Sequence, residues 1–216
     1  QFELVDLLRL DHFRGLAGYW RVNGNSQTAI SGKWINSPGR TLLNKVKNDL
    51  GVDDHLPIIA EDLGVITPDV EKLRKSFKLP GMKILQFAFD GNEDNPYLPK
   101  NIKGENWVVY TGTHDNSTSK SWWEGLDSDS KSRIRNEFDF SDKPSWNLIE
   151  IGMNTNANLF IVPIQDILSL DDSCRLNKPG TIKNNWKWKL NQTLGEIDEN
   201  IRIFSKLGRD SGRISN

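Results

Sequence analysis

The stretch LVDLLRLDHFRG, residues 4–15, determines how the rest of the chain is interpreted. Its apolar part predicts a short strand, which ends in the carboxylate of Asp11 with Arg9 two residues earlier. Strand side chains alternate between two faces, so Arg9 and Asp11 point to the same side at the strand's carboxyl end. A guanidinium keeps a neighbouring carboxylate ionised, which suits Asp11 to attack an electrophilic carbon. A structural ion pair at a strand end is the alternative interpretation.

Composition and charge exclude several classes of protein. With 216 residues, 36% hydrophobic and 26% charged, the chain is typical of one globular domain or part of one. The formal net charge is -1 without a long run of either sign, so neither nucleic acid nor a membrane is an expected partner. Cys174 is the only cysteine, which excludes an intramolecular disulfide and indicates a reducing compartment. The sequence contains no apolar run of 18 residues, so it predicts no membrane-spanning helix.

Apolar strands alternate with helical segments along the chain, which predicts β/α units and a parallel sheet. Strands that are apolar on both faces are typical of a sheet covered on both sides. In such folds, ligands bind at the carboxyl ends of the strands. Five strands are expected, ending near Asp11, Glu61, Phe89, Thr113 and Val162.

Helical spacing of apolar residues predicts the segments between the strands. The helix over 41–51 has Leu42 and Leu43 on its apolar face, and a second helix over 67–77 begins with Thr67 and Pro68. Residues 16–40 are rich in glycine and polar residues and predict a long loop, which would cover a site. Further helices are expected at 119–126, 128–138, 144–156 and 196–210.

Three of the expected strand ends carry a carboxylate: Asp11, Glu61 and Asp115. The spacing between Glu61 and Asp115, with one strand between them, is typical of the repeating units of a barrel. Taken singly, Glu61 also fits a strand-end cap and Asp115 an ordinary Asx turn. Together, the three acids predict a site at one rim of the strands.

Several carboxylates in a chain with eight tryptophans favour cleavage of glycosidic bonds. One acid attacks the anomeric carbon, and a second protonates the leaving oxygen and later deprotonates the acceptor. Asp11, beside Arg9, suits the nucleophile, and Glu61, which follows an apolar run, suits the acid/base. Asp115 would hold sugar hydroxyls, with His114 donating a hydrogen bond beside it.

Five motifs occur in order along the chain: RLDHFRG, IIAEDLGVITPDV, LPGMKILQFAF, NPYLP and VVYTGTHDN. Together they closely resemble the 4-alpha-glucanotransferases called amylomaltase or disproportionating enzyme, glycoside hydrolase family 77 of the alpha-amylase clan. The stretch RLNKPGTIKNNWKW, residues 175–188, resembles the C-terminal signature of that family. The resemblance extends to about residue 205.

The resemblance implies an α/β fold, a (β/α)8 TIM barrel of which this chain covers about strands 4 to 8. Asp11 matches the nucleophile, Glu61 the acid/base and Asp115 the transition-state stabiliser, whereas Arg9 and His114 match residues that contact substrate. The implied reaction transfers an alpha-1,4-glucan segment through a glycosyl-enzyme to the 4-hydroxyl of glucose or another glucan. Malto-oligosaccharides and alpha-1,4-glucans are the implied partners, with no cofactor and no metal. The implied location is cytoplasmic, or the plastid stroma in a plant or alga.

The position of the nucleophile predicts that the chain is partial. If Asp11 ends strand four, strands one to three precede Gln1, so residues 1–216 are expected to be the C-terminal part of a single catalytic barrel. A closed barrel takes about 250 residues, and an open part leaves unpaired edges. We therefore expect the polypeptide as given to be poorly stable or inactive alone. Asn23, Gly24 and Lys100 depart from the residues common in the family, at positions that bear on substrate subsites.

Two other functions compete with glucan transfer. A non-catalytic glucan-binding fragment is consistent with a partial chain and with the tryptophans. A metal-dependent hydrolase would use His12, His55 and His114 with the acids as ligands. Its weakness is that the chain has only three histidines, none of them in an H-x-H or H-x-x-x-H pair.

Overall fold

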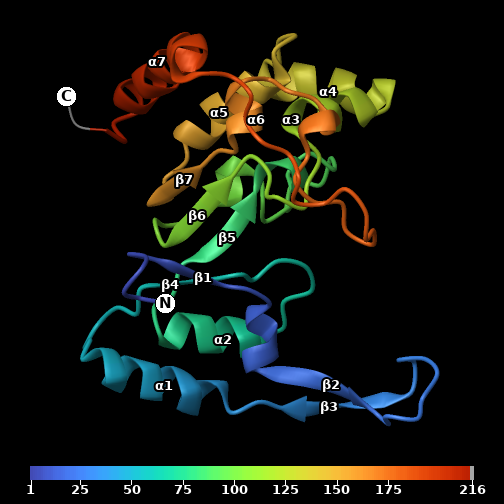
Figure 1. The fold of residues 1–216 in the computed structure, drawn as a ribbon, viewed down its shortest axis with the longest axis vertical. Coiled ribbons are helices and arrows are strands. Elements are labelled where there is room, and N and C mark those ends of the chain that lie inside the picture. The colour runs from blue at the N-terminus through green and yellow to red at the C-terminus, as the bar shows by residue number, and fades with distance from the viewer. Residues whose placement is uncertain (215–216) are drawn as a thin grey trace. The chain divides into compact units, whose positions relative to one another are not determined.

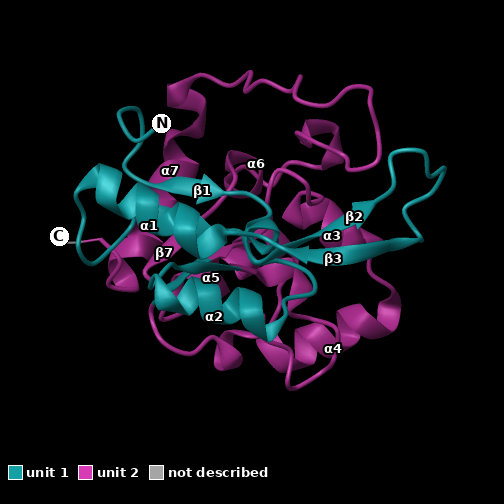
Figure 2. Cartoon of the chain, turned by 90° about the horizontal axis from the view of Figure 1, so that it is seen from below, with its two compact units in different colours: residues 1–82, 106–108 teal, residues 83–105, 109–216 magenta. Residues whose placement is uncertain are grey.

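The computed structural model describes residues 1–214 and divides into two compact units, which are coloured separately in Figure 2. Unit 1 consists of Gln1–Met82 and Asn106–Val108. Unit 2 consists of Lys83–Glu105 and the described residues from Val109 onward.

Unit 1 contains two short parallel strands (Figure 1): β1, Leu8–Leu10, and β4, Ile58–Ala60. Their register pairs Leu8 with Ile58 and Leu10 with Ala60. Strand β4 is fully buried, as its apolar sequence predicts. Strand β1 is shorter than expected, because the preceding Leu4 is 80% exposed and adds nothing to the core.

Helices α1, Gly39–Leu50, and α2, Pro68–Ser76, complete the β/α units around these strands. Both were predicted, and α1 ends at Gly51, whose φ of 64° lies in the left-handed region that glycine adopts readily. The prediction that Leu42 lies on the core face of α1 is wrong, because this residue is 51% exposed. The buried side of the helix is centred on the adjacent Leu43. The core of unit 1 joins α1, α2 and β4 through Phe13, Leu43, Leu56, Ile58, Ala60, Val70, Leu73, Phe77 and Leu79.

The predicted loop at residues 16–40 is wrong for most of its length, because it forms an antiparallel hairpin. Strand β2, Gly18–Val22, pairs with β3, Gly32–Asn36, and the register places Trp20 opposite Trp34. The two indole rings meet edge to face with centroids 5.6 Å apart. The stabilising contacts run between strands, so neither segment shows them in its own sequence.

Unit 2 holds most of a three-stranded sheet in the order β5-β6-β7, and several helices (Figure 1). The strands are β5, Gly81–Ile84, β6, Trp107–Tyr110, and β7, Leu159–Ile161, the first two of which begin in unit 1. The expected strand over 82–89 ends early, because a 3-10 helix follows at Leu85–Phe87. The helices are α3, Ser119–Gly125, α4, Ser128–Phe138, α5, Pro144–Met153, α6, Ile164–Ile167, and α7, Leu194–Asp210.

Helix α7 packs on the rest of unit 2 through an apolar cluster. Ile149 and Met153 of α5 and Ile167 of α6 are buried there, with Phe204 and Leu207 of α7 packed against them. Within residues 1–214, no helix has the length and apolar character needed to cross a bilayer.

Candidate functional site

Asp11 and Glu61 follow the carboxyl ends of two adjacent parallel strands. The main-chain N of Glu61 donates to the carbonyl of Leu10 at 3.0 Å, which continues the pairing of β1 with β4. The Glu61 Oε2 atom accepts a hydrogen bond of 2.7 Å from the main-chain N of His12, the residue directly after Asp11. The structure therefore brings the two predicted carboxylates of unit 1 to the same strand ends.

Arg9 forms the ion pair that the sequence predicts. Its Nη1 atom lies 2.9 Å from Asp11 Oδ1, and its Nε donates to the sulfur of Met82 at 3.3 Å. The Arg9 side chain is 29% exposed, whereas that of Asp11 is 75% exposed. Arg9 is therefore the more buried partner of the pair, and it holds a carboxylate that is mostly exposed.

Glu61 follows an apolar run, as the sequence shows, but its carboxylate lies among backbone amides. Besides the bond from His12, Glu61 Oε1 accepts from the main-chain N of Leu63 at 3.1 Å. His12 has a φ of 49°, in the left-handed region that non-glycine residues rarely adopt. The apolar run ends at Ala60, so the turns on either side of Glu61 supply backbone amides instead of hydrocarbon.

A buried ion pair supports this end of unit 1. Arg74 Nε lies 3.0 Å from Asp62 Oδ2, and the main-chain N of Met82 donates to Asp62 Oδ1 at 2.7 Å. The Arg74 guanidinium also lies 4.5 Å from the ring centroid of Trp107. A Cβ atom at Gly81 would lie 2.5 Å from Asp62, so glycine is required there. Asp62 is thus a structural residue that joins the end of β4 to α2 and β5.

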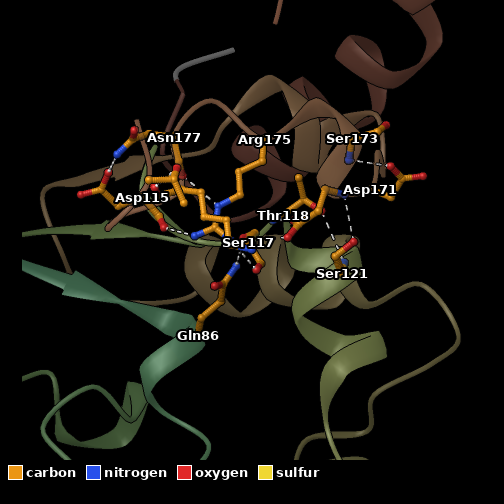
Figure 3. A network of polar contacts seen from close by, with 12 residues as sticks. Gln86, Asp115, Ser117, Thr118, Ser121, Asp171, Ser173, Arg175 and Asn177 are labelled. Atoms are coloured by element: carbon orange, nitrogen blue, oxygen red, sulfur yellow. Dashed lines mark hydrogen bonds and ion pairs between the residues drawn. The ribbon is translucent and has the colours of Figure 1, made fainter. Parts of the chain in front are cut away.

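Asp115 is held by a later segment of unit 2 (Figure 3). Asn177 Nδ2 donates to Asp115 Oδ1 at 2.6 Å, and His114 Nε2 lies 3.3 Å from the same oxygen. Arg175 donates from Nη2 to the main-chain carbonyl of Asp115 and from Nε to the carbonyl of Asn177, the latter at 2.9 Å. The side chains of Arg175 and Asn177 therefore determine where the Asp115 carboxylate points.

Arg175 also connects this segment to the loop that follows Asp115. Its Nη1 donates to Ser117 Oγ at 3.1 Å, and Gln86 Nε2 donates to the carbonyl of Ser117 at 2.9 Å (Figure 3). Asp172 Oδ1 accepts from the main-chain N of Thr118 at 2.8 Å. Sequence reasoning missed Arg175 and Asn177 as site residues. Their only signal is that they open the stretch that resembles the family's C-terminal signature.

His114 contacts an aromatic residue of that same stretch. The ring centroids of His114 and Trp186 lie 5.0 Å apart, and the angle between the two ring planes is 39°. The main-chain N of Trp186 donates to the carbonyl of Leu176 at 2.6 Å. His114 is thus held between Asp115 and Trp186.

A cavity of about 310 Å³ lies behind the loop that carries His114. Asp166 lines it but is only 1% exposed, and its carboxylate accepts from the Thr111 hydroxyl at 2.5 Å. Ser119 donates to Asp166 from both its main-chain N and its hydroxyl, each at 2.7 Å. Burial raises the pKa of the Asp166 carboxyl. Asp166 therefore joins the end of β6 to the start of α3.

The part of the chain that the structure describes contains no group of three or more His, Cys, Asp or Glu side chains placed to hold a metal ion. The parallel strands β1 and β4, which are packed with helices and followed by carboxylates at their carboxyl ends, define an α/β protein of the barrel class.

Known proteins identify the family. The family model described as 4-alpha-glucanotransferase matches residues 1–194. The chain is 45% identical over 189 residues to the 4-alpha-glucanotransferase of Synechocystis sp., and 45% identical over 190 residues to the chloroplastic/amyloplastic enzyme of Arabidopsis thaliana. These matches cover 87% of this chain but 37% and 32% of those relatives, so the chain spans about a third of their length. The chain belongs to the 4-alpha-glucanotransferase family, as predicted.

Solved structures confirm the fold. The amylomaltase from Streptococcus agalactiae in complex with acarbose matches 99% of this chain and 43% of its own, with a TM-score of 0.89 and 31% identity. The amylomaltase from Corynebacterium glutamicum matches 98% of this chain and 36% of its own, with a TM-score of 0.69 and 17% identity, and so supports the fold alone. The chain has the fold of part of a (β/α)8 barrel, and β1, β4, β5, β6 and β7 supply its five expected strands.

Proposed function

We propose that residues 1–216 form the C-terminal part of a catalytic barrel, and that the full-length protein is a 4-alpha-glucanotransferase. It would move alpha-1,4-glucan segments from malto-oligosaccharides or longer glucans to glucose or another glucan. The observation that carries this proposal is the hydrogen bond from the main chain of His12 to Glu61, which places a second carboxylate beside Asp11. The names of the relatives support the substrate class.

In the proposed reaction, Asp11 attacks the anomeric carbon of the donor and forms a glycosyl ester. Glu61 gives its proton to the departing glycosidic oxygen, and the shortened glucan leaves. Glu61 then takes the proton of the acceptor's 4-hydroxyl, whose oxygen displaces Asp11 and restores the alpha linkage. Glu61 Oε2 accepts from the His12 amide and Oε1 from the Leu63 amide, so the backbone orients the acid/base carboxyl while each oxygen keeps a lone pair for the proton.

The remaining predicted residues have supporting roles in this proposal. Arg9 orients Asp11 through the ion pair of 2.9 Å. Asp115 holds sugar hydroxyls through Oδ2, because its Oδ1 atom is bonded by Asn177, and this interaction strengthens as the ring distorts. His114 donates a further hydrogen bond to the same sugar. The chloroplastic/amyloplastic forms among the relatives support a plastid location if the source is a plant or alga. For any other source, a cytoplasmic location is part of the proposal.

The test is the action of the full-length protein on maltotriose. We expect glucose and longer malto-oligosaccharides to form while the number of reducing ends stays constant, because transfer replaces each bond that it breaks. Asp11→Asn should abolish the reaction, whereas Asp6→Asn, at an exposed position of the same segment, should leave it unchanged. Activity in the Asp11→Asn variant would reject the assigned nucleophile. A rise in reducing ends that matches the loss of maltotriose would show a hydrolase, and glucan binding without turnover would show a binding protein.

A further inference from the structure

A second group of aromatic and polar side chains lies on hairpin β2–β3, outside the residues assigned to the reaction. Trp20 and Trp34 are cross-strand partners, so their side chains project from the same face of the hairpin. They are 39% and 55% exposed. Two adjacent indoles with this much accessible surface form an apolar patch of the kind that marks a binding surface.

Glycines shape this face of the hairpin. A Cβ atom at Gly32 would lie 2.7 Å from the indole of Trp20, and one at Gly18 would lie 3.2 Å from the carbonyl of Ile35. Because Gly32 has no side chain, the Trp20 indole lies directly over the backbone of β3. Its Nε1 atom donates to the carbonyl of Ala29 at 2.8 Å, which fixes the orientation of the ring.

The aromatic face continues into a cavity of about 240 Å³ between the hairpin and the start of α2. Trp34 and Asn36 line it from the hairpin, and Thr67 and Asp69 line it from α2. Arg14 also lines it and covers one face of the Trp34 ring: its guanidinium lies over that ring, 4.4 Å from the centroid, and donates to Thr67 Oγ1 at 3.2 Å, so a ligand packs on the rest of the indole. One indole wall therefore faces a set of hydrogen-bond donors and acceptors.

The charges around the cavity favour a neutral ligand. Arg14 supplies a cation, and Asp69 supplies a carboxylate whose pKa is lowered chiefly by a hydrogen bond from the Thr67 hydroxyl. An anionic ligand would be attracted by Arg14 but repelled by Asp69. A sugar ring has an apolar face for the indole and hydroxyls that bond to both charged groups. The cavity is below the range of about 300 to 1,000 Å³ that is typical of sites for drug-sized ligands, so it suits a single ring.

We propose that hairpin β2–β3 and the first turn of α2 form a second binding site for an alpha-1,4-glucan chain. One glucose unit occupies the cavity beside Trp34, and a neighbouring unit of the same chain lies on Trp20. This inference rests on the proposed function for the substrate class. The site holds a long glucan at a second point, so it raises the effective concentration of that chain at the catalytic carboxylates. A short oligosaccharide that fills only the catalytic site gains nothing from it.

The experiment measures binding and turnover separately in the full-length protein. Trp34→Ala removes the indole wall, and Asp69→Asn removes an acceptor while it leaves both indoles in place. Tyr19→Ala is the matched control, because Tyr19 is 47% exposed but lies opposite Ile35 on the other face of the hairpin. Retardation in native gels that contain amylose reports binding. Rates with maltotriose and with amylose report the contribution of the site to catalysis.

We expect both Trp34→Ala and Asp69→Asn to reduce retardation by amylose, and Trp34→Ala to raise the KM for amylose by about 2- to 10-fold, the range expected for one lost aromatic contact. Maltotriose kinetics should stay as in the wild type, which also shows that the variants are folded. The proposal is overturned if both variants migrate as the wild type does, or if Tyr19→Ala has an equal effect. Retardation that depends on Trp34 in a protein without transfer activity would support this site and reject the proposed function.

Discussion

The two regions that carry the predicted carboxylates are built in different ways. In unit 1, Asp11 and Glu61 are placed by neighbouring parallel strands and by backbone amides, and only Arg9 adds a side-chain contact. In unit 2, Asp115 depends on side chains of a segment far along the chain, Arg175 and Asn177. Backbone positions survive most substitutions, whereas side-chain contacts are lost with one. The position of Asp115 should therefore be the more easily disturbed of the two.

The largest effect on glucan transfer is expected from two single substitutions that replace a carboxylate of unit 1 by an amide. In the full-length protein, Glu61→Gln should slow glucan transfer by about 10²- to 10⁴-fold, because the leaving oxygen lacks a proton donor. An alpha-glycosyl fluoride needs no such proton, so Glu61→Gln should still form the glycosyl-enzyme from it. Asp11→Asn should fail with both donors, because the attacking oxygen is lost.

Mass spectrometry of the protein after brief exposure to the fluoride checks this division of roles. The exposed Glu3 provides a control, and Glu3→Gln should behave as the wild type. Equal losses with glucan and fluoride in Glu61→Gln would contradict the assignment of Glu61 as the acid.

The next effect tests the buried support of unit 1. Asp62→Ala leaves the Arg74 guanidinium buried without its carboxylate partner, and it should lower the free energy of unfolding by about 3 to 5 kcal/mol. Asp54→Ala is the control, because Asp54 pairs with Lys78 at 3.6 Å while its side chain is 80% exposed. That change should cost less than about 1 kcal/mol. Urea unfolding of the full-length variants measures both values, and equal costs would show that the buried pair adds no stability.

These contrasts explain which features the sequence could predict. A strand-end carboxylate beside an arginine, as at Asp11, depends on a period of two residues that is visible locally. The hydrogen bonds from Asn177 to Asp115 and from Ser119 to Asp166 join residues far apart in sequence, and no local pattern marks them. Hairpin β2–β3 was missed for the same reason, since its Trp20–Trp34 contact exists only after the strands pair. The amides around Glu61 come from turns whose geometry short apolar strands do not specify.

A smaller effect is expected from the contact that orients Asp115. Asn177→Ala in the full-length protein should lower kcat by about 10-fold with little change in KM, because one charge-assisted hydrogen bond to Oδ1 is lost. Asn177→Asp should lower it further, since two carboxylates then face each other. Asn191→Ala, at an exposed position before α7, is the control. If kcat is retained in Asn177→Ala, the side chain does not position Asp115 for catalysis.

The smallest effect concerns Asp166, the buried carboxylate of unit 2. Burial raises the pKa of Asp166 in the folded state, so the folded protein keeps this proton to a higher pH than the unfolded chain does. From about pH 4 upward, the unfolded state binds fewer protons at this residue, and the free energy of unfolding falls as the pH rises toward the raised value. Asp166→Asn removes the proton exchange, and its amide oxygen still accepts from the main-chain N of Ser119.

At pH 4, Asp166→Asn should therefore be slightly less stable than the wild type, by less than about 1 kcal/mol, because the hydroxyls of Thr111 and Ser119 must reorient. The difference should shrink or reverse by pH 7, where the wild type carries the cost of a buried charge. Urea unfolding of both proteins at the two pH values measures this change. His114 and Arg175 line the same cavity and are kept in both proteins, so the difference between the two profiles isolates residue 166. Parallel pH profiles would mean that the pKa of Asp166 is not raised. The hydroxyls around Asp166 in unit 2 would then stabilise a buried carboxylate as well as Arg74 stabilises Asp62 in unit 1.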